Sequence, residues 1–567
     1  MRRRRWLVVL VALAAACGDD SAAVDAATPD DAVDSGGTPD LALTIEPDLV
    51  CPGPGCETGD TETLRVGAAA VDITPAFGPE TEVLQEDPGG DGLWDRGVDT
   101  YNDANGNGVF DGLWIAGFAV GRPASGVSDP QWARAIVIEN GDTRIGFVSL
   151  DLVGLFYDDV RRIRQRLADM DLDYLGVMTT HSHQSRDTLG QWGPVLGDTG
   201  IADAYMEQVS AGAEAAVEQA VAALEPANID YASTRLRDQP GGVRRYISDS
   251  RDPQVIDDEI RLLRFVQAGG EQTIATLVNF GAHPEYAGSR NTLLSSDLAH
   301  GLREAIENGT TGPSGELEGV GGIAVFINGA VGSQIGPNDL DAPVRFNGEA
   351  FEGRTLELAH GVGAQLGAFS LQALRSATRE QSAHLSLRVA VLEVAAENTF
   401  FHIAFESGVF PTRQPLNPDE RYTRFNPPRI ETEVAVIDVG RARLLLVPGE
   451  LDPALFVGGY DGAFAPMDRP VVDESAAVPP DLSRAPGGPY LRERAALRAD
   501  GEAEYVFLFG LANDELGYFI PSFDFVLSPS FPYLVEADGD HYEETVSLGP
   551  EIWPRLDATL QALFDHE

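Results

Sequence analysis

Apolar runs of strand length recur along the chain, and each run is followed by polar residues. The runs are rich in β-branched or aromatic side chains and are bounded by glycine, proline or polar residues, a pattern typical of β-strands. They lie at residues 144–150, 175–178, 274–280, 323–327, 444–447 and 505–509. We therefore predict a strand at each of these places.

Two segments between these strands have a helical pattern. In residues 157–167, the side chains of Val160, Ile163 and Leu167 fall on one face of a helix, and residues 205–224 are alanine-rich with repeated apolar spacing. Strands that alternate with helices predict an α/β fold, with large mixed or mostly parallel sheets on which the helices pack. Because no further change of composition is evident, residues 64–567 are predicted to form one domain.

The polar residues that follow the strands include types that can perform chemistry. In open sheets of this class, ligands bind where loops leave the carboxyl ends of the strands. We therefore expect these residues to gather at one edge of the fold. They are Asp151, His181, His183, His283, Asn328, Ser333, Glu450, Asn513 and Tyr518.

The composition excludes some classes of partner. With 567 residues and 43% hydrophobic content, the chain can form an extensive core. Its formal net charge of −49 would repel nucleic acid and anionic membrane surfaces, so neither is an expected partner. Cations would instead be attracted.

The N-terminus resembles a bacterial lipoprotein signal, which would occupy residues 1–17. Residues 2–5 are arginines, residues 6–13 are apolar, and three alanines precede Cys17. The resemblance implies cleavage before Cys17, lipidation of this cysteine and export to the cell envelope, where the lipid would anchor the protein to a membrane. An ordinary secretory signal with a coincidental cysteine is the alternative.

Residues 18–63 are predicted to form a disordered acidic linker between this anchor and the folded domain. They are rich in aspartate, alanine, proline, glycine and threonine and have little periodicity. Cys51 and Cys56 lie in this segment, and an oxidising compartment permits a local disulfide between them.

Three residues at the strand ends have the side chains of a catalytic zinc site. Such a site uses a few nitrogen and oxygen ligands and keeps one position open for water or substrate. His181, His283 and Glu450 are of the right types, whereas spacing alone does not single out Tyr518. Taken singly, each histidine is more often a hydrogen-bonded loop or core residue than a ligand.

Short motifs in the folded region resemble those of the neutral (non-lysosomal) ceramidases. Thr180-His-Ser-His183 is similar to the family's Thr-His-Thr-His, Pro448-Gly-Glu450 to its Pro-Gly-Glu, and residues 512–518 to its Asn-x-Tyr-x-x-Tyr turn. Further similar segments lie at residues 71–75, 129–138, 258–265, 279–283, 328–333 and 542–545. No single motif is decisive, but they occur in the family's order over most of the folded region.

The resemblance implies a zinc site and a set of residues around it. The zinc ligands would be His181, His283, Glu450 and Tyr518. The residues that act beside the zinc would be His183, Ser333, Tyr542 and one arginine of the pair Arg244 and Arg245, for which we take Arg245.

The implied ligands suggest a hydrolytic mechanism for the predicted site. Zinc would activate a water molecule and polarise an amide carbonyl. His183 would transfer the proton, and Tyr542 or the arginine would stabilise the oxyanion. Ser333 would have a supporting role, because a serine nucleophile needs an adjacent base.

Two loops and the C-terminal part depart from the family pattern. The family's Ser-Gly-Pro-Gly after the histidine pair is replaced by Gln184-Ser-Arg-Asp187, and its Asp-Val-Ser-Pro-Asn by residues 331–336, without the aspartate. Arg186 and Asp187 would either accept a polar group of the substrate or form a surface ion pair of little energetic consequence. The family's C-terminal immunoglobulin-like domain is expected to be absent, which argues against long-chain ceramide in a bilayer as substrate.

An insertion at residues 87–114 contains the pattern of a calcium loop. Oxygen side chains occupy loop positions 1, 3, 5 and 9, and a glycine occupies position 6. These oxygen side chains belong to Asp103, Asn105, Asn107 and Asp111. Trp114 replaces the glutamate usual at position 12, so the aspartates at 91, 95 and 99 would complete the shell. The alternative is that these residue types only form turns.

Together these patterns predict an envelope-anchored zinc amidohydrolase that cleaves an N-acyl bond of a ceramide-like or related lipid. Zinc is the expected cofactor, with calcium as a structural one. The expected partners are a lipid or N-acyl substrate and, through the anchor, a membrane. The alternatives are a catalytically idle, calcium-stabilised surface binding protein and a zinc hydrolase of another amide or ester.

Overall fold

The computed structural model describes residues 46–53, 63–336, 343–418, 421–466, 469–476, 478–499 and 501–566. These residues belong to one compact unit that begins at Glu46. The predicted lipoprotein signal with Cys17 lies outside the described residues, as does Cys56. Within the part of the chain that is described, no helix combines the length and the apolar character needed to cross a bilayer.

The larger of two main sheets has nine strands in the order β16-β12-β11-β9-β2-β6-β7-β8, with β18 also paired to β9. The β7/β8 and β12/β16 pairs are parallel, and the other pairs are antiparallel. The strands are β2 (Arg65–Asp72), β6 (Trp132–Asn140), β7 (Thr143–Leu150), β8 (Tyr174–Thr179), β9 (Glu225–Arg235), β11 (Glu259–Gln267), β12 (Thr273–Phe280), β16 (Ile323–Asn328) and β18 (Thr378–Glu380). A mostly parallel sheet was therefore a wrong alternative, because short turns connect β6 to β7 and β11 to β12 as hairpins.

The smaller main sheet has five strands in the order β1-β19-β20-β21-β25. Its only parallel pair among the described residues is β21/β25. The strands are β1 (Leu49–Cys51), β19 (Leu385–Ala395), β20 (Arg429–Val439), β21 (Ala442–Leu446) and β25 (Tyr505–Phe509).

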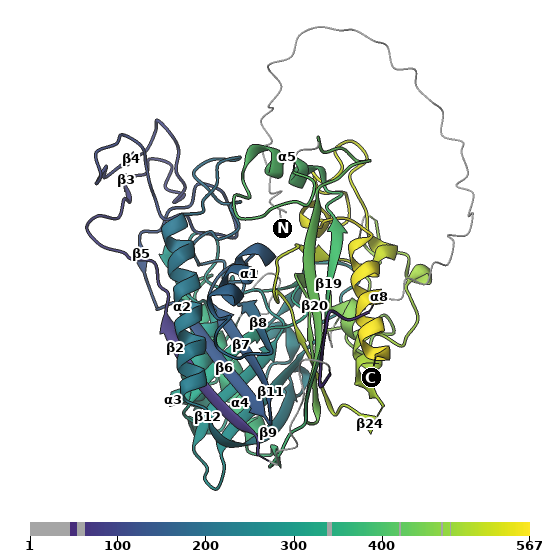
Figure 1. The fold of residues 1–567 in the computed structure, drawn as a ribbon. Coiled ribbons are helices and arrows are strands. Elements are labelled where there is room, and N and C mark those ends of the chain that lie inside the picture. The colour runs from purple at the N-terminus through teal and green to yellow at the C-terminus, as the bar shows by residue number, and fades with distance from the viewer. Residues whose placement is uncertain are drawn as a thin grey trace. The chain divides into compact units, whose positions relative to one another are not determined.

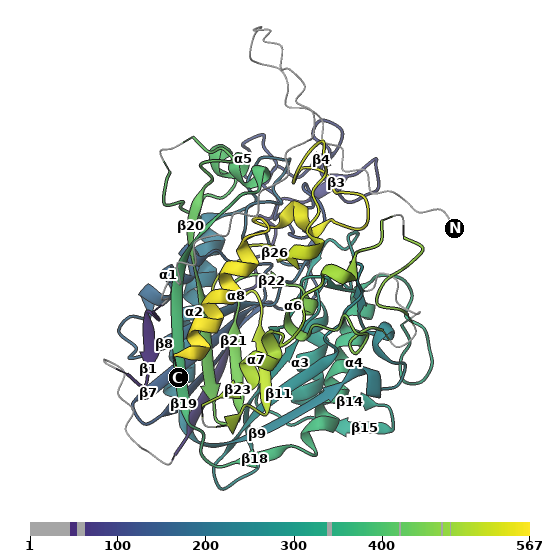
Figure 2. The same ribbon diagram turned by 90° about the vertical axis from the view of Figure 1, so that its right-hand side faces the viewer.

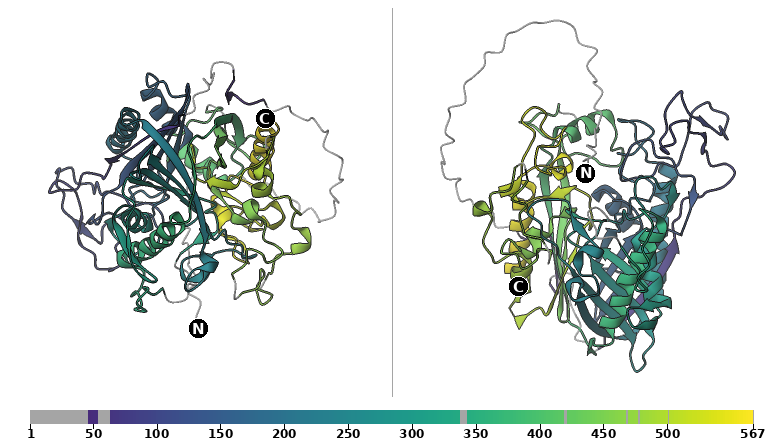
Figure 3. Two further views of the ribbon diagram at one scale, coloured as in Figure 1. Left: turned by 90° about the horizontal axis from the view of Figure 1, so that it is seen from below. Right: turned by 180° about the vertical axis from the view of Figure 1, so that it is seen from behind.

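The two sheets pack face to face, and helices cover their outer faces (Figures 1, 2 and 3). Phe147 and Phe265 of the larger sheet share one buried cluster with Leu444 and Phe507 of the smaller sheet. Burial of each such side chain contributes about 1.5–3 kcal/mol. The helices α2 (Asp203–Ala222), α3 (Leu298–Asn308) and α4 (Leu356–Leu374) cover the larger sheet, and α8 (Ile552–Asp565) covers the smaller one. The predicted α/β fold with large mixed sheets and packed helices is confirmed.

Shorter elements complete the fold at the edges and strand ends. The predicted helix at 157–167 is α1 (Tyr157–Arg166), and the predicted helix at 205–224 is α2. The other α-helices are α5 (Thr399–Ser407), α6 (Pro453–Val457) and α7 (Leu491–Ala496). The short strands form the pairs β3 (Leu84–Glu86) with β4 (Thr100–Tyr101), β5 (Gly126–Val127) with β13 (Leu293–Leu294), β10 (Ser248–Asp249) with β17 (Gln334–Ile335), β14 (Gly309–Gly312) with β15 (Gly315–Glu318), β22 (Glu450–Leu451) with β26 (Tyr518–Phe519), and β23 (Leu497–Arg498) with β24 (Gly501–Glu502).

The prediction of a disordered linker over residues 18–63 is wrong at β1. Leu49–Cys51 pairs antiparallel with β19 at the edge of the smaller sheet. Cys51 is 1% exposed and disulfide-bonded. The apolar, β-branched Leu-Val-Cys sequence fits a pleated, half-buried edge, and the acidic residues before it masked this short signal.

Candidate active site

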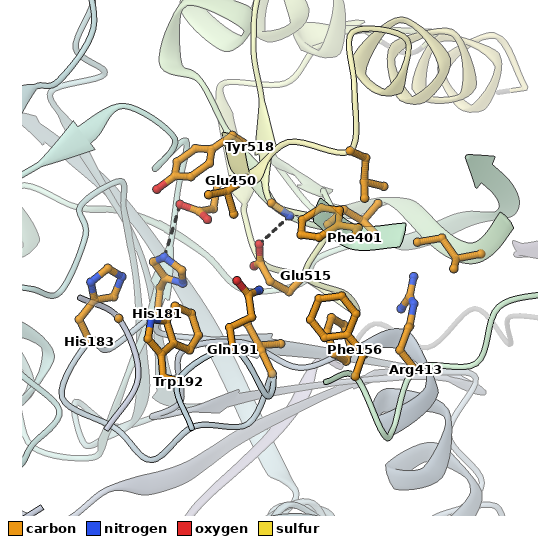
Figure 4. A pocket seen from close by; sticks show the side chains of 18 of the residues that line it. Phe156, His181, His183, Gln191, Trp192, Phe401, Arg413, Glu450, Glu515 and Tyr518 are labelled. Carbon is orange, nitrogen blue, oxygen red and sulfur yellow. Dashed lines mark hydrogen bonds and ion pairs between the residues drawn. The ribbon is translucent and has the colours of Figure 1, made fainter. Parts of the chain in front are cut away.

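Loops from both main sheets bring the predicted zinc ligands together, and Figure 4 shows His181, Glu450 and Tyr518 among them. His181 follows β8 and His283 follows β12, so both histidines come from the larger sheet. Glu450 begins β22 and Tyr518 begins β26, and these strands follow β21 and β25 of the smaller sheet. In the parallel pair β22/β26, Glu450 lies directly opposite Tyr518. The strand-end rule therefore locates all four residues at one place.

Short contacts join the polar atoms of these four residues. Two groups that share His181 have all their ligand atoms within 4.8 Å of one another, namely His181 with His183 and His283, and His181 with Glu450 and Glu515. His283 Nε2 is 2.9 Å from Glu450 Oε2, and His181 Nε2 is 3.4 Å from the same oxygen. The Tyr518 hydroxyl is 3.4 Å from His283 Nε2. All four side chains are at least 90% buried. Two imidazoles, a carboxylate and a phenol in a closed cluster form a donor set that fits Zn²⁺.

Hydrogen bonds to backbone carbonyls orient both imidazoles for metal binding. His181 Nδ1 is 2.6 Å from the carbonyl oxygen of Val153, and His283 Nδ1 is 3.0 Å from that of Gln334. Because a carbonyl only accepts, each ring donates from Nδ1 and presents Nε2 toward Glu450. Histidine ligands of metals are oriented in the same way by a partner on the far ring nitrogen.

Asn328, at the end of β16, holds the two histidine-bearing turns together. Its Nδ2 donates to the carbonyl oxygens of Thr180 and Ala282, each at 3.0 Å, and its Oδ1 accepts from the Ala282 N–H at 3.0 Å. His181 itself has a φ of 65°, in the left-handed region. Such a conformation costs about 1–3 kcal/mol, so the surrounding bonds must fix this turn.

A second buried carboxylate, Glu515, lies beside Glu450 and was not predicted as a site residue. His181, Glu450 and Glu515 each offer a ligand atom within 4.8 Å of the other two. Burial alone would raise the pKa of Glu450, but His181 and then His283 lower it to about 2. Burial and the charge of Glu450 raise the pKa of Glu515, whose Oε2 is buried without a hydrogen-bond partner among the described residues. The motif at 512–518 contained this residue, but its position in a loop next to Asp514 gave no sign of its orientation.

His183 lies against the two predicted histidine ligands. Its ring centroid is 4.9 Å from that of His181 and 5.5 Å from that of His283. Burial, followed by the positive charge of these neighbours, lowers the pKa of His183 well below its usual range. Its Nδ1 is 3.8 Å from Glu285 Oε2, and burial raises the pKa of Glu285 to about 7. His183 is therefore neutral at neutral pH and able to accept a proton.

Residues 116–122, which we call the shelf, pack against His183. Phe118 contacts its ring edge to face at 5.3 Å, and Gly117 faces its Cβ. Arg122 is fully buried and donates to the carbonyl oxygens of His183 and Ala116. Burial lowers the pKa of Arg122 to about 9, so it stays charged at neutral pH. None of these shelf residues was predicted, because the sequence does not show that this segment lies under His183.

The other predicted catalytic residues occupy different places relative to the cluster. Tyr542 is 52% exposed, and its ring centroid is 6.2 Å from that of Tyr518. Ser333 is 1% exposed and immediately precedes Gln334, whose carbonyl binds His283. Arg245 ends the turn η2 (Val243–Arg245), where its side chain packs against Gly241. Their catalytic roles stay predictions.

The charged loop after the histidine pair faces inward, so both interpretations of Arg186 and Asp187 are wrong. Asp187 is fully buried and accepts hydrogen bonds from the backbone N–H groups of Leu189, Gly190 and Trp192 at 2.8–3.0 Å. The Arg186 guanidinium lies 5.5 Å from the centre of the Tyr205 ring. Asp187 therefore organises the turn that leads to Trp192, rather than binding substrate or forming a surface ion pair.

A cavity of 170 Å³ runs from the cluster into an apolar region. His181, His183, Glu450, Glu515, Tyr518 and Tyr542 line its polar end. Its remaining wall is mainly apolar and includes Phe118, Phe156, Leu189, Trp192, Phe401, Phe405, Phe410, Ile430, Leu516, Val546 and Leu548. Figure 4 shows the two ends, with the histidines on one side and Phe156, Phe401 and Arg413 on the other. Arg413 is paired with Asp514 at 2.6 Å, so its charge is neutralised within the wall.

The predicted calcium loop forms a closed turn in the insertion. Asp103 accepts from the backbone N–H groups of Asn107 and Gly108, each at 3.0 Å. Asp111 accepts from the side-chain amides of Asn105 and Asn107 at 2.8 and 2.7 Å. The four predicted ligands therefore face one another, and calcium binding there stays a prediction.

Two comparisons relate this chain to the neutral ceramidases. Residues 102–369 match the family model described as neutral/alkaline non-lysosomal ceramidase, N-terminal. A solved structure of neutral ceramidase from Pseudomonas aeruginosa aligns with a TM-score of 0.55 and 16% sequence identity, over 89% of this chain and 75% of that one. A second, described as ceramidase complexed with C2, aligns with a TM-score of 0.55 and 16% identity, over 89% of this chain and 74% of that one. The search of curated proteins gave no match.

Proposed function

Because this chain has the fold of the neutral ceramidases and its residues 102–369 match the model of their N-terminal domain, we propose that it is a zinc-dependent amidohydrolase that cleaves the N-acyl bond of a ceramide-like lipid. The family match supports a hydrolase, and the matched range contains His181, His183 and His283. The other two predicted ligands, Glu450 and Tyr518, lie outside that range, and the geometry of the cluster supports them.

The observation that carries this proposal is a cavity with a metal-binding end and an apolar end. An N-acyl substrate has a polar amide joined to an apolar chain. The cavity has a polar end for the amide and an apolar wall for the chain. Each methylene buried in the apolar part would contribute about 0.8 kcal/mol. Binding of the acyl chain there would hold the amide beside Glu450 and the histidines.

Each residue of the site would have its own role in hydrolysis. His181, His283, Glu450 and Tyr518 would hold the zinc ion. When bound, zinc would supply a Lewis acid and an activated water. His183 Nδ1 is buried toward Glu285, so the ring exchanges protons with the cavity through Nε2. Tyr542, which lines the polar end of the cavity, would donate from its hydroxyl to the oxygen that becomes negative as the amide is attacked.

A panel of N-acyl substrates with increasing chain length tests the proposal. The zinc-loaded protein should release fatty acid from N-acyl sphingoid bases, and no release from any N-acyl lipid would reject the proposal. We expect Phe405→Ala to lower kcat/KM for long-chain substrates by about 10- to 100-fold, because the removed ring contributes about 1.5–3 kcal/mol of apolar burial. Hydrolysis of an N-acetyl substrate should change little, because a short chain does not reach the ring.

Phe425→Ala is the matched control for this prediction. Phe425 is 83% exposed and does not line the cavity, so its removal should leave the chain-length profile unchanged. An equal loss of activity on short and long substrates in Phe405→Ala would contradict the assignment of this wall to the acyl chain.

We propose that the protein is anchored to the cell envelope through a lipid on Cys17. The arginine, apolar and alanine segments before this cysteine support the proposal. Metabolic labelling with a fatty acid should mark the wild-type protein, and Cys17→Ala should lose the label and leave the membrane fraction. A Cys17→Ala protein that still carries the label would contradict the anchor.

A further inference from the structure

Glu515 is a buried carboxylate to which the proposed mechanism gives no role. It is 8% exposed and lines the catalytic cavity. Figure 4 shows its side chain between the histidines and Phe401. Glu515 stands at the third position of the motif Asn-x-Tyr-x-x-Tyr, where the family has a tyrosine, so the second carboxylate of this site is a feature of this chain.

The two oxygens of Glu515 have different surroundings. Oε1 accepts the backbone N–H of Gly517 at 2.9 Å. Oε2 is buried and has no hydrogen-bond partner among the described residues. A buried carboxylate oxygen without a partner costs free energy unless a donor or a cation meets it. The surroundings of Oε2 therefore indicate that a ligand binds there.

The side chains around Glu515 leave its charge uncompensated. The adjacent Asp514 is paired with Arg413 by two hydrogen bonds of 2.6 and 2.9 Å. Glu450 lies within ion-pair distance of His283 and His181, at 2.9 and 3.4 Å, whereas no arginine or histidine of the described residues forms such a pair with Glu515. A cation beside Glu515 would remove this imbalance.

Glu515 lies within reach of two predicted metal ligands. It forms one group with His181 and Glu450, in which the three ligand atoms all lie within 4.8 Å of one another. Ligand atoms of one zinc ion, each about 2.0–2.2 Å from the metal, are at most about 4.4 Å apart, so a small adjustment of the side chains suffices for coordination. Zn²⁺ also has no geometric preference from its d electrons, so it can accept a further ligand.

We propose that Glu515 Oε2 is a fifth protein ligand of the zinc ion, so that this chain holds its metal with two carboxylates. The inference rests on the proposed function, because it needs a metal in the cluster. The ligand set would then be two imidazoles, the carboxylates of Glu450 and Glu515, and the Tyr518 phenol.

The side chain of Glu515 is held toward the cluster by close packing. A Cβ atom at Gly154 would lie 3.0 Å from the Glu515 Cγ, so only glycine allows this approach. Gly154 follows Val153, whose carbonyl oxygen is 2.6 Å from His181 Nδ1. Asn513, in the same turn as Glu515, has a φ of 66°, a costly conformation that persists only where the surrounding structure fixes it. One segment therefore positions both Glu515 and His181.

Zinc titration of the full-length protein tests the assignment. The protein is stripped of metal and titrated with Zn²⁺ alone in competition with a chelating dye. Glu515→Gln keeps the shape of the side chain and removes its charge, and we expect it to bind Zn²⁺ at least about tenfold more weakly than the wild type. Its metal-free form should melt no lower than the wild type, because the amide replaces a buried carboxylate that lacks a cation partner.

Cobalt spectroscopy distinguishes a ligand from a nearby charge. The visible absorption of bound Co²⁺ depends on the number and geometry of its ligands, so Glu515→Gln should change the spectrum of the cobalt-loaded protein. Glu285→Gln is the matched control. Glu285 is also buried and lies 3.8 Å from His183 Nδ1, but it belongs to neither group of ligand atoms that shares His181. Its replacement should leave the cobalt spectrum unchanged.

Two outcomes would overturn the role of Glu515 as a ligand. One is an unchanged zinc affinity in Glu515→Gln, and the other is a lower affinity with an unchanged cobalt spectrum. Both would leave the proposed function standing, whereas a wild-type chain that binds no zinc would contradict both proposals. Glu515→Asp, which withdraws the carboxylate by one methylene, should also change the spectrum and keeps the test valid if Glu515→Gln fails to fold.

Discussion

In His283→Ala, bound zinc is expected to fall from about one per chain to almost none, and amide hydrolysis is expected to disappear with it. His283 Nε2 is the nitrogen closest to Glu450 Oε2, at 2.9 Å, and its ring also meets the Tyr518 hydroxyl. Loss of a partner that merely orients a ligand typically lowers metal affinity 10- to 100-fold, so loss of a ligand itself should lower it further. Elemental analysis and kcat/KM measured on the same preparation check this.

The control for this prediction is His384→Ala. His384 is exposed and immediately precedes β19, so its replacement removes an imidazole without touching the cluster. Full zinc content in His283→Ala would contradict the assignment of the metal site. Full activity without zinc would instead contradict the proposed function, so the two failures can be told apart.

Most of the metal cluster could be predicted from the sequence, because its members follow the carboxyl ends of strands. His181, His283 and Glu450 follow β8, β12 and β21, strands of the two main sheets, and strand ends can be predicted from apolar runs. Tyr518 depended on the family resemblance, because its position opposite Glu450 arises from the short β22/β26 pair. Two-residue strands have no periodicity from which pairing can be predicted.

The residues that the sequence did not reveal act through contacts between distant segments. Glu515 and Glu285 reach the cluster only because their loops turn inward, and Phe118 does so because residues 116–122 lie under the histidine pair. Asp187 was read as a surface or substrate-binding charge, since composition cannot distinguish an exposed carboxylate from one that accepts three backbone N–H groups. The direction in which a charged side chain points is a tertiary property.

Gly117→Ala should lower kcat by about 100-fold while leaving zinc content nearly unchanged. A Cβ atom at this position would lie 2.6 Å from both Cβ and Cγ of His183, and the φ of +109° disfavours any side chain. Because Cβ and Cγ lie close to the backbone, His183 cannot swing clear by changing a distal rotamer, so the ring itself must move. A displacement of about 1 Å at a catalytic group can cost about 100-fold in rate.

In Gly117→Ala, kcat should fall while the zinc content stays nearly constant, so the two quantities change independently. The three atoms nearest to a Cβ at Gly117 all belong to His183, so a variant that retains zinc and loses kcat would identify His183 as a proton-transfer group and not as a ligand. Gly78→Ala is the matched control, since a Cβ there meets no atom within 4 Å, and it should retain wild-type kinetics. If Gly117→Ala lost its zinc in parallel with its activity, the shelf would be supporting the metal cluster as a whole, and the separate role given to His183 would be wrong.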